Sequence, residues 1–178
     1  MRHFSPFVTA SALIGGLAFA ALAADDDIAI PFPAEYKTTY TNYFTGDRQN
    51  REQIISLYAN DIAVKGARET GEMPYGSILV GELIPAVKDA DGDPQESVLG
   101  HLISSGETAA IVLMTRIEGN DARYPDELKV GDWEFEVYSP AGENLAKDTT
   151  GCRECHHPLT DTEFMFSIEH LAMKATEG

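Results

Sequence analysis

Cysteine is scarce in this sequence: Cys152 and Cys155 are the only two among 178 residues. Two cysteines this close together cannot link distant segments, so the sequence excludes a scaffold held by several disulfides. Basic residues are also few, with 13 Lys and Arg against 29 Asp and Glu and a formal net charge of −16. Such an acidic chain lacks the basic surface that binds nucleic acid or anionic lipid, although it could attract a basic redox partner.

Long hydrophobic runs are absent except near the N-terminus, where residues 7–22 are apolar or small and residues 21–23 read Ala-Leu-Ala, a small-x-small cleavage pattern. A membrane anchor is the competing interpretation, but the run barely reaches the roughly 20 residues that span a bilayer. We therefore predict a secretory signal peptide over residues 1–23. The mature chain, residues 24–178, is expected to be a single periplasmic domain without a membrane anchor.

Both cysteines lie in the run Cys-Arg-Glu-Cys-His, residues 152–156. In a C-x-x-C-H motif the thiols of Cys152 and Cys155 bond covalently to the vinyl groups of a haem, and His156 ligates the iron. The same residues could instead form a disulfide, a thioredoxin-like redox pair or half of a zinc site. Because covalent haem attachment takes place outside the inner membrane, the predicted export favours one covalently attached haem c with its iron.

The middle of the chain is typical of β-strands. Aromatic, β-branched and alternating residues between turn residues predict strands over residues 36–44, 53–59, 77–87, 98–104, 109–117 and 133–138. The connections are short and contain no regular crossover helices, which favours antiparallel pairing. We therefore predict an α+β fold that is mainly an antiparallel β-sheet with a few helices.

Two helices have recognisable boundaries. Asn60 can cap a helix that runs to about residue 69. Thr160 and Glu163 have the spacing of a capping box, which predicts that a C-terminal helix begins there, after the haem-binding turn, with Phe164, Ile168, Leu171 and Ala175 on one face. Arg153 and Glu154, the variable residues of the motif, are expected to face solvent.

The position of the motif bears on the sixth iron ligand. Only 22 residues follow His156, so a downstream ligand would have to be Met165 or Met173. His101 and Met114 are upstream alternatives, but a surface role for the histidine and a packing role for the methionine are more common. We therefore expect the sheet to form the distal side of the haem, with predominantly apolar residues.

Taken together, these segments resemble the cytochrome P-460 and cytochrome c′-beta family over most of the mature chain, from about Tyr36 to the final helix. The resemblance implies a mostly antiparallel β fold, a C-terminal haem motif and a homodimer. The four-helix cytochromes c′ also carry a C-terminal motif, but the aromatic-rich, alternating middle disfavours them. The segments that carry the resemblance read Leu57-Tyr58-Ala59-Asn60, Thr70-Gly71-Glu72, Ser77-Ile78-Leu79-Val80-Gly81-Glu82-Leu83, Asp132-Trp133-Glu134-Phe135, Cys152 to His156, and Thr162-Glu163-Phe164-Met165-Phe166.

This chain departs from the hydroxylamine-oxidising members at two places. Those members carry a lysine cross-linked to the haem at the position that Gly81 matches here. They also place a distal carboxylate near the segment that here reads Ile-Val-Leu-Met, residues 111–114. Both departures favour the c′-beta branch, which implies five-coordinate iron with an open distal site that binds nitric oxide or a similar small ligand. Hydroxylamine or nitric oxide oxidation, with a cross-link from Lys65 or Lys88, and six-coordinate electron transfer remain the alternatives.

Overall fold

The computed structural model describes Met1 and residues 30–177. The predicted signal peptide therefore lies outside the described residues, apart from Met1. Among the described residues, no helix has the length and apolar character needed to cross a membrane.

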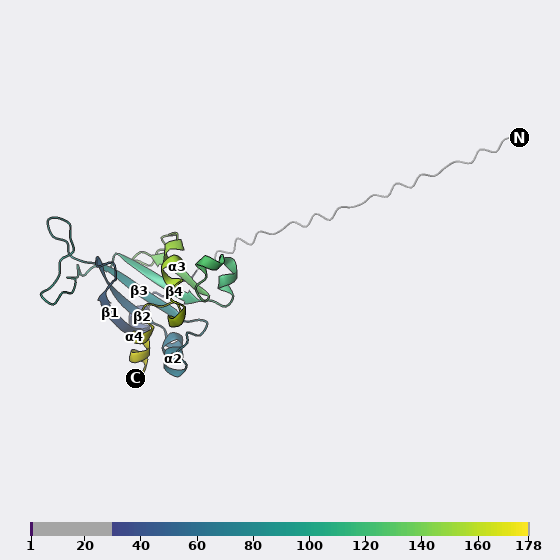
Figure 1. Cartoon of the computed structure of the whole chain (residues 1–178), viewed down its shortest axis with the longest axis horizontal. Helices are drawn as coiled ribbons and strands as arrows, with labels where there is room; N and C mark the ends of the chain where they lie inside the picture. Colours follow the sequence, from purple (N-terminus) through teal and green to yellow (C-terminus); the bar gives the residue numbers. More distant parts are fainter. Residues whose placement is uncertain (2–29, 178) are drawn as a thin grey trace.

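One five-stranded antiparallel sheet forms the centre of the molecule (Figure 1), and its strands follow each other in chain order. This arrangement confirms the predicted mainly antiparallel fold. Two of the predicted strands match the observed bounds at both ends, and two others match within two residues. The strands are β1 (Thr41–Asp47), β2 (Gln53–Ala59), β3 (Ile78–Pro85), β4 (Ala110–Arg116) and β5 (Trp133–Tyr138).

Short helices complete the α+β architecture. The predicted Asn60 cap is confirmed, because its side chain accepts a hydrogen bond from the backbone N–H of Ala63 at 3.0 Å. The second and fourth helices pack against each other below the sheet in Figure 1. The helices are α1 (Tyr36–Thr39), α2 (Asp61–Glu69), α3 (Thr150–His156) and α4 (Ile168–Ala175), with 3-10 turns η1 (Asn120–Arg123), η2 (Asp126–Leu128) and η3 (Thr160–Thr162).

The sheet has two covered faces because successive side chains of a strand point to opposite sides. The first face packs against α2 and α4 around the fully buried Trp133 and Leu171. The second face is covered by the N-terminal segment, residues 30–40, whose Tyr36 packs with Val80 and Leu113. Residues 81 and 82 of β3 therefore serve different faces: Gly81 faces the helices, whereas Glu82 faces the N-terminal segment.

Glu82 is a buried carboxylate, 5% exposed, at the centre of the second face. It accepts hydrogen bonds from the hydroxyls of Tyr36 at 2.7 Å and Tyr58 at 3.2 Å, and Lys37 Nζ lies 2.6 Å away. A cavity of about 210 Å³ opens beside this cluster, between Ile111 and the N-terminal segment. The carboxylate thus fixes the N-terminal segment to the sheet.

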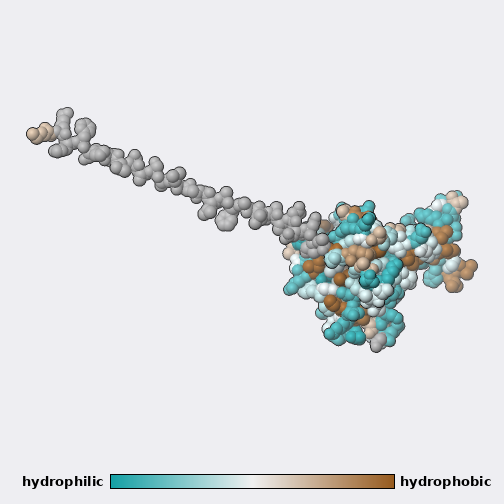
Figure 2. Space-filling view, turned by 180° about the vertical axis from the view of Figure 1, so that it is seen from behind, coloured by the Kyte–Doolittle hydropathy of each residue, from teal (hydrophilic) through white to brown (hydrophobic). Residues whose placement is uncertain are grey.

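The strand predicted over residues 98–104 is wrong. Residues 86–109 instead form an arm with isolated β-bridges that projects from the sheet (Figure 1), and Figure 2 shows hydrophobic surface on it. Gly100 adopts φ +77° and donates its N–H to the Ser97 carbonyl, so the chain reverses inside the predicted strand. Val98 and Leu99 are consequently exposed.

The predicted starts of two further elements also need correction. The strand predicted over residues 36–44 begins with α1, and β1 starts only at Thr41. The C-terminal helix does not begin at a capping box: Glu163 adopts the left-handed conformation and its carboxylate pairs with Arg116. The helix α4 begins five residues later, at Ile168.

We predict that Glu82→Gln lowers the free energy of unfolding by about 2 kcal/mol near neutral pH, because hydrogen bonds to charged groups contribute roughly 1.5–3 kcal/mol. Burial alone would raise the pKa of Glu82, but hydrogen bonds from Lys37 and Tyr36 outweigh it and lower the pKa. The stabilisation is therefore present above the unfolded pKa of about 4.3 and is lost as the pH falls through the folded pKa.

Urea unfolding of the variant and the wild type at a series of pH values from about 3 to 7 measures this effect. The exposed Glu107→Gln serves as the matched control. A difference in stability that stays constant across this pH range would contradict the assigned role of the Glu82 charge.

Candidate haem site

The helix α3 places the two motif cysteines and the motif histidine at the side of the sheet. Just before the helix, Asp148 Oδ1 accepts a hydrogen bond from the backbone N–H of Thr150 at 2.9 Å, which forms a local turn that leads into it. Both thiols are free; Cys152 is half-buried and Cys155 is exposed. Burial raises the pKa of the Cys152 thiol. In the described part of the chain, no group of three or more His, Cys, Asp or Glu side chains is placed to hold a metal ion.

Arg153 is the buried anchor of this helix, which corrects the expectation that it faces solvent. Only 1% of the residue is exposed, whereas Glu154 is exposed as expected. Its guanidinium lies 2.9 Å from the carboxylate of Glu134, donates to the Trp133 carbonyl at 3.1 Å and stacks 3.3 Å above the Tyr124 ring. The residue between the two cysteines therefore fastens α3 to β5.

Glu134 is correspondingly buried, 5% exposed, although its strand alternates apolar and acidic residues. Burial alone would raise the pKa of Glu134, but hydrogen bonds from Tyr124 and Asn120, together with the Arg153 charge, lower it. The carboxylate thus remains charged and compensates the buried guanidinium.

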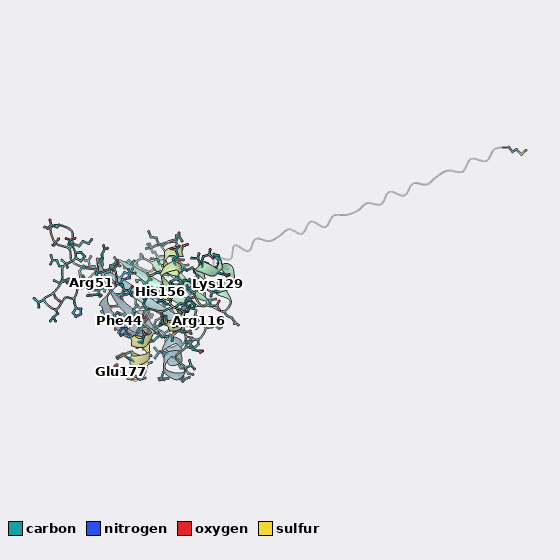
Figure 3. All side chains as sticks on the ribbon, viewed as in Figure 1. Phe44, Arg51, Arg116, Lys129, His156 and Glu177 are labelled. Carbon is teal, nitrogen blue, oxygen red and sulfur yellow. The ribbon has the colours of Figure 1, made fainter. Side chains whose placement is uncertain are left out.

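His156 is oriented by a backbone carbonyl. Its Nδ1 lies 2.6 Å from the carbonyl oxygen of Phe164, and its ring makes edge contacts with Phe135 and Phe166 at centroid distances of 5.0 Å. Burial lowers the pKa of His156, so the imidazole is neutral near pH 7. With Nδ1–H donated to the carbonyl, Nε2 is the nitrogen that can ligate a metal. Figure 3 shows His156 near the middle of the described fold.

An apolar surface surrounds Gly81 on the same face of the sheet. A Cβ atom at this position would lie 2.9 Å from Val112 Cγ2, 3.2 Å from Ile55 Cδ1 and 3.3 Å from Leu57 Cδ2. These three side chains are only half-buried, and Leu57 packs in the same cluster as Cys152. The surface is therefore the part of the first face that the helices leave partly uncovered.

The other predicted candidates lie in different places. His101 is on the projecting arm with its side chain 75% exposed. Met165 is buried beside α4, and Met173 is 66% exposed. Met114 packs in the first core, on the same face as Gly81. Lys65 and Lys88, the candidates for a cross-link to the haem, are both exposed; Lys65 is on α2 and Lys88 is on the arm.

These residues fit haem c: two free thiols one helical turn apart, a neutral imidazole with Nε2 available, and an adjacent apolar surface. The antiparallel sheet and the C-terminal motif define the class of c-type haem proteins built on a sheet rather than on a helical bundle. A sequence model of the family described as Cytochrome P460 matches residues 33–167, and the chain belongs to this family. No curated protein matches the chain. Membership in the family supports haem c and its iron as the cofactor.

Two parts of the site were missed by the sequence reasoning. The two residues between the cysteines of a C-x-x-C-H motif can be of any type, so the sequence gives no signal that Arg153 is buried. The carbonyl of Phe164 carries no side-chain signal, and the left-handed conformation that presents it occurs without glycine.

We predict that Arg153→Gln lowers the free energy of unfolding by about 3 kcal/mol, because it removes the buried cation 2.9 Å from Glu134 and leaves only the more exposed Arg123 guanidinium, at 3.8 Å. Glu154→Gln is the matched control on the same helix and is expected to change it by less than about 0.5 kcal/mol. Thermal and urea unfolding of the purified proteins measure both effects. Equal, small effects of the two substitutions would show that the buried ion pair is not needed.

We also predict that mass spectrometry of the haem-bearing peptide gives the mass of one haem and the peptide that contains Cys152 and Cys155, with no second peptide attached. The double substitution Cys152→Ser, Cys155→Ser should abolish haem that survives denaturing electrophoresis. A second peptide from Lys65 or Lys88 on the haem would instead establish a cross-link.

Proposed function

We propose that this protein is a periplasmic c-type monohaem protein that binds nitric oxide at an open iron coordination site, for buffering, transport or redox removal. Cys152 and Cys155 hold the haem through thioether bonds, and His156 is the one protein ligand. The observation that carries the proposal is the apolar surface around Gly81, next to the motif helix.

The character of that surface favours nitric oxide over dioxygen. On this face, the side chains that surround Gly81 on β2 to β5 are all apolar: Ile55, Leu57, Leu79, Leu83, Ala110, Val112, Met114, Phe135 and Val137. Bound dioxygen is polar and is stabilised by a hydrogen-bond donor in the pocket. Nitric oxide needs no such donor, so the aliphatic surface around Gly81 favours it. The Arg48 guanidinium acts electrostatically on Cys152 and His156. It donates to Gln53 Oε1 at 2.5 Å and is therefore already engaged.

Hydroxylamine oxidation is the second candidate function, because some members of the cytochrome P-460 family perform it. A catalyst of that kind needs a group that transfers protons near the substrate. The surface around Gly81 offers no titratable side chain on β2 to β5, and the position of the cross-linking lysine is occupied by glycine. These two features support ligand binding over oxidation.

Electron transfer is the third candidate and would need a sixth ligand from the protein. His101 is on the exposed arm, and Met165 is buried beside α4, so neither favours this role. Met114 shares the face of Gly81, and its thioether is the group that the following measurement tests.

We predict that the ferrous protein, without added ligand, has the absorption spectrum of high-spin, five-coordinate haem. Addition of nitric oxide should convert it completely at stoichiometric concentrations, and hydroxylamine should not be turned over. Spectra of the ferric, ferrous and nitric oxide-treated forms, with Met114→Leu as the control for a thioether ligand, measure this. A low-spin ferrous spectrum that becomes high-spin in Met114→Leu would overturn the proposal in favour of electron transfer.

A further inference from the structure

Two consecutive residues after the haem motif have strained backbones. Glu163 adopts φ 54° and Phe164 adopts φ 60°. This left-handed region is unfavourable for residues with a Cβ, and it persists where surrounding contacts enforce it. Among the described residues, these are the only two adjacent non-glycine residues with positive φ. The strained pair also supplies the carbonyl oxygen, that of Phe164, which lies 2.6 Å from His156 Nδ1.

Contacts from the edge of the sheet hold this pair in place. The indole N–H of Trp133 donates to the Glu163 carbonyl at 2.9 Å, and Trp133 itself is fully buried. The guanidinium of Arg116 pairs with the Glu163 carboxylate, with both side chains less than a third exposed. Trp133 and Arg116 are register partners on β5 and β4. Both anchors therefore project from one rung of a rigid sheet, and Figure 3 marks Arg116 beside the centre of the fold.

A third restraint acts on the Phe164 ring. Gly131 has φ +66°, and a Cβ added to it would lie 2.5 Å from Phe164 Cε2. The absence of a side chain at Gly131 therefore makes room for the ring. The backbone N–H of Phe164 also donates to the Leu159 carbonyl at 2.8 Å. The ring and the backbone N–H of Phe164 are thus both restrained, and with them the carbonyl that faces His156.

We propose that Arg116 and Trp133 are positioning residues for the iron ligand: by holding Glu163 and Phe164 in the left-handed conformation, they fix the carbonyl that accepts the His156 Nδ1–H. This inference rests on the proposed role of His156 as the proximal ligand. A hydrogen bond to the outer nitrogen of a ligating histidine fixes its tautomer and orientation and raises its basicity. When the hydrogen bond from His156 Nδ1 to the Phe164 carbonyl is weakened, the imidazole donates less electron density to the iron. The iron–imidazole bond then becomes weaker, and ferrous iron is favoured over ferric iron.

The test compares holoprotein variants that release the strained pair in different ways. Trp133→Phe keeps an aromatic ring but removes the N–H donor, and Arg116→Gln removes the charge that holds Glu163. Arg116→Lys restores a cation and should recover part of the effect. The matched control is Tyr43→Phe, which removes a buried hydrogen bond of 3.0 Å to Ser167, in the same segment but away from the carbonyl.

Resonance Raman spectroscopy of the ferrous protein and redox titration supply the readouts. We expect Trp133→Phe and Arg116→Gln to lower the iron–imidazole stretching frequency and raise the midpoint potential, whereas Tyr43→Phe lowers stability without moving either. Mutation of outer-shell partners of this kind changes metal affinity by about 10- to 100-fold, and a change of that size in the ratio of ferric to ferrous binding moves the midpoint potential by about 60 to 120 mV. Should Trp133→Phe not fold, the two Arg116 variants decide the question.

Unchanged frequency and potential in the variants, with an iron–imidazole band present in the wild type, would overturn the positioning role and leave the proposed function standing. Absence of that band from the wild-type protein would overturn the proposed function, because the band requires five-coordinate ferrous haem with a histidine ligand, and with it the positioning role that rests on that function.

Discussion

The buried ion pair between Arg153 and Glu134 is the constraint on which the site depends. A helix of seven residues such as α3 is too short to be stable alone in water, so its position must come from tertiary contacts. Arg153 supplies them from inside the haem motif, through the Glu134 carboxylate and the Tyr124 ring. Because this residue lies between the two cysteines, the same turn of helix that would present the thiols is fastened to β5.

The proximal side and the apolar side of the site come from different parts of the sheet. The end of β4 and the start of β5 carry Arg116 and Trp133, which hold the segment that orients His156. The middle of β2 to β4 carries the aliphatic cluster around Gly81. One rigid element thus sets both the geometry of the ligand and the polarity of the space beside it.

Much of the fold followed from local patterns, and so did the reactive residues. β2 and β5 begin and end at the predicted residues because each is a run rich in aromatic and branched aliphatic residues between turn residues. The sequence predicts the haem-binding residues Cys152, Cys155 and His156, because covalent haem attachment and iron ligation require a fixed spacing. The arm was missed because a local turn at Gly100 reverses the chain inside the predicted strand. The late start of α4 and the burial of Arg153 were missed because each depends on contacts between residues distant in sequence. Glu163 illustrates this: its spacing from Thr160 fits a capping box, but Arg116 binds its carboxylate.

The neighbouring positions 81 and 82 on β3 have a consequence for how the chain can change in length. Inserting or deleting one residue before them would exchange the faces of the sheet to which they point. The Glu82 carboxylate would then face the apolar surface, and Gly81 would face the hydroxyls of Tyr36 and Tyr58. Both environments would fail at once. Residues 86–109 form isolated β-bridges instead of a regular strand, so a change of one residue there does not exchange two faces of the sheet. Natural or engineered length variation should therefore accumulate in the arm and spare the strand that leads into it.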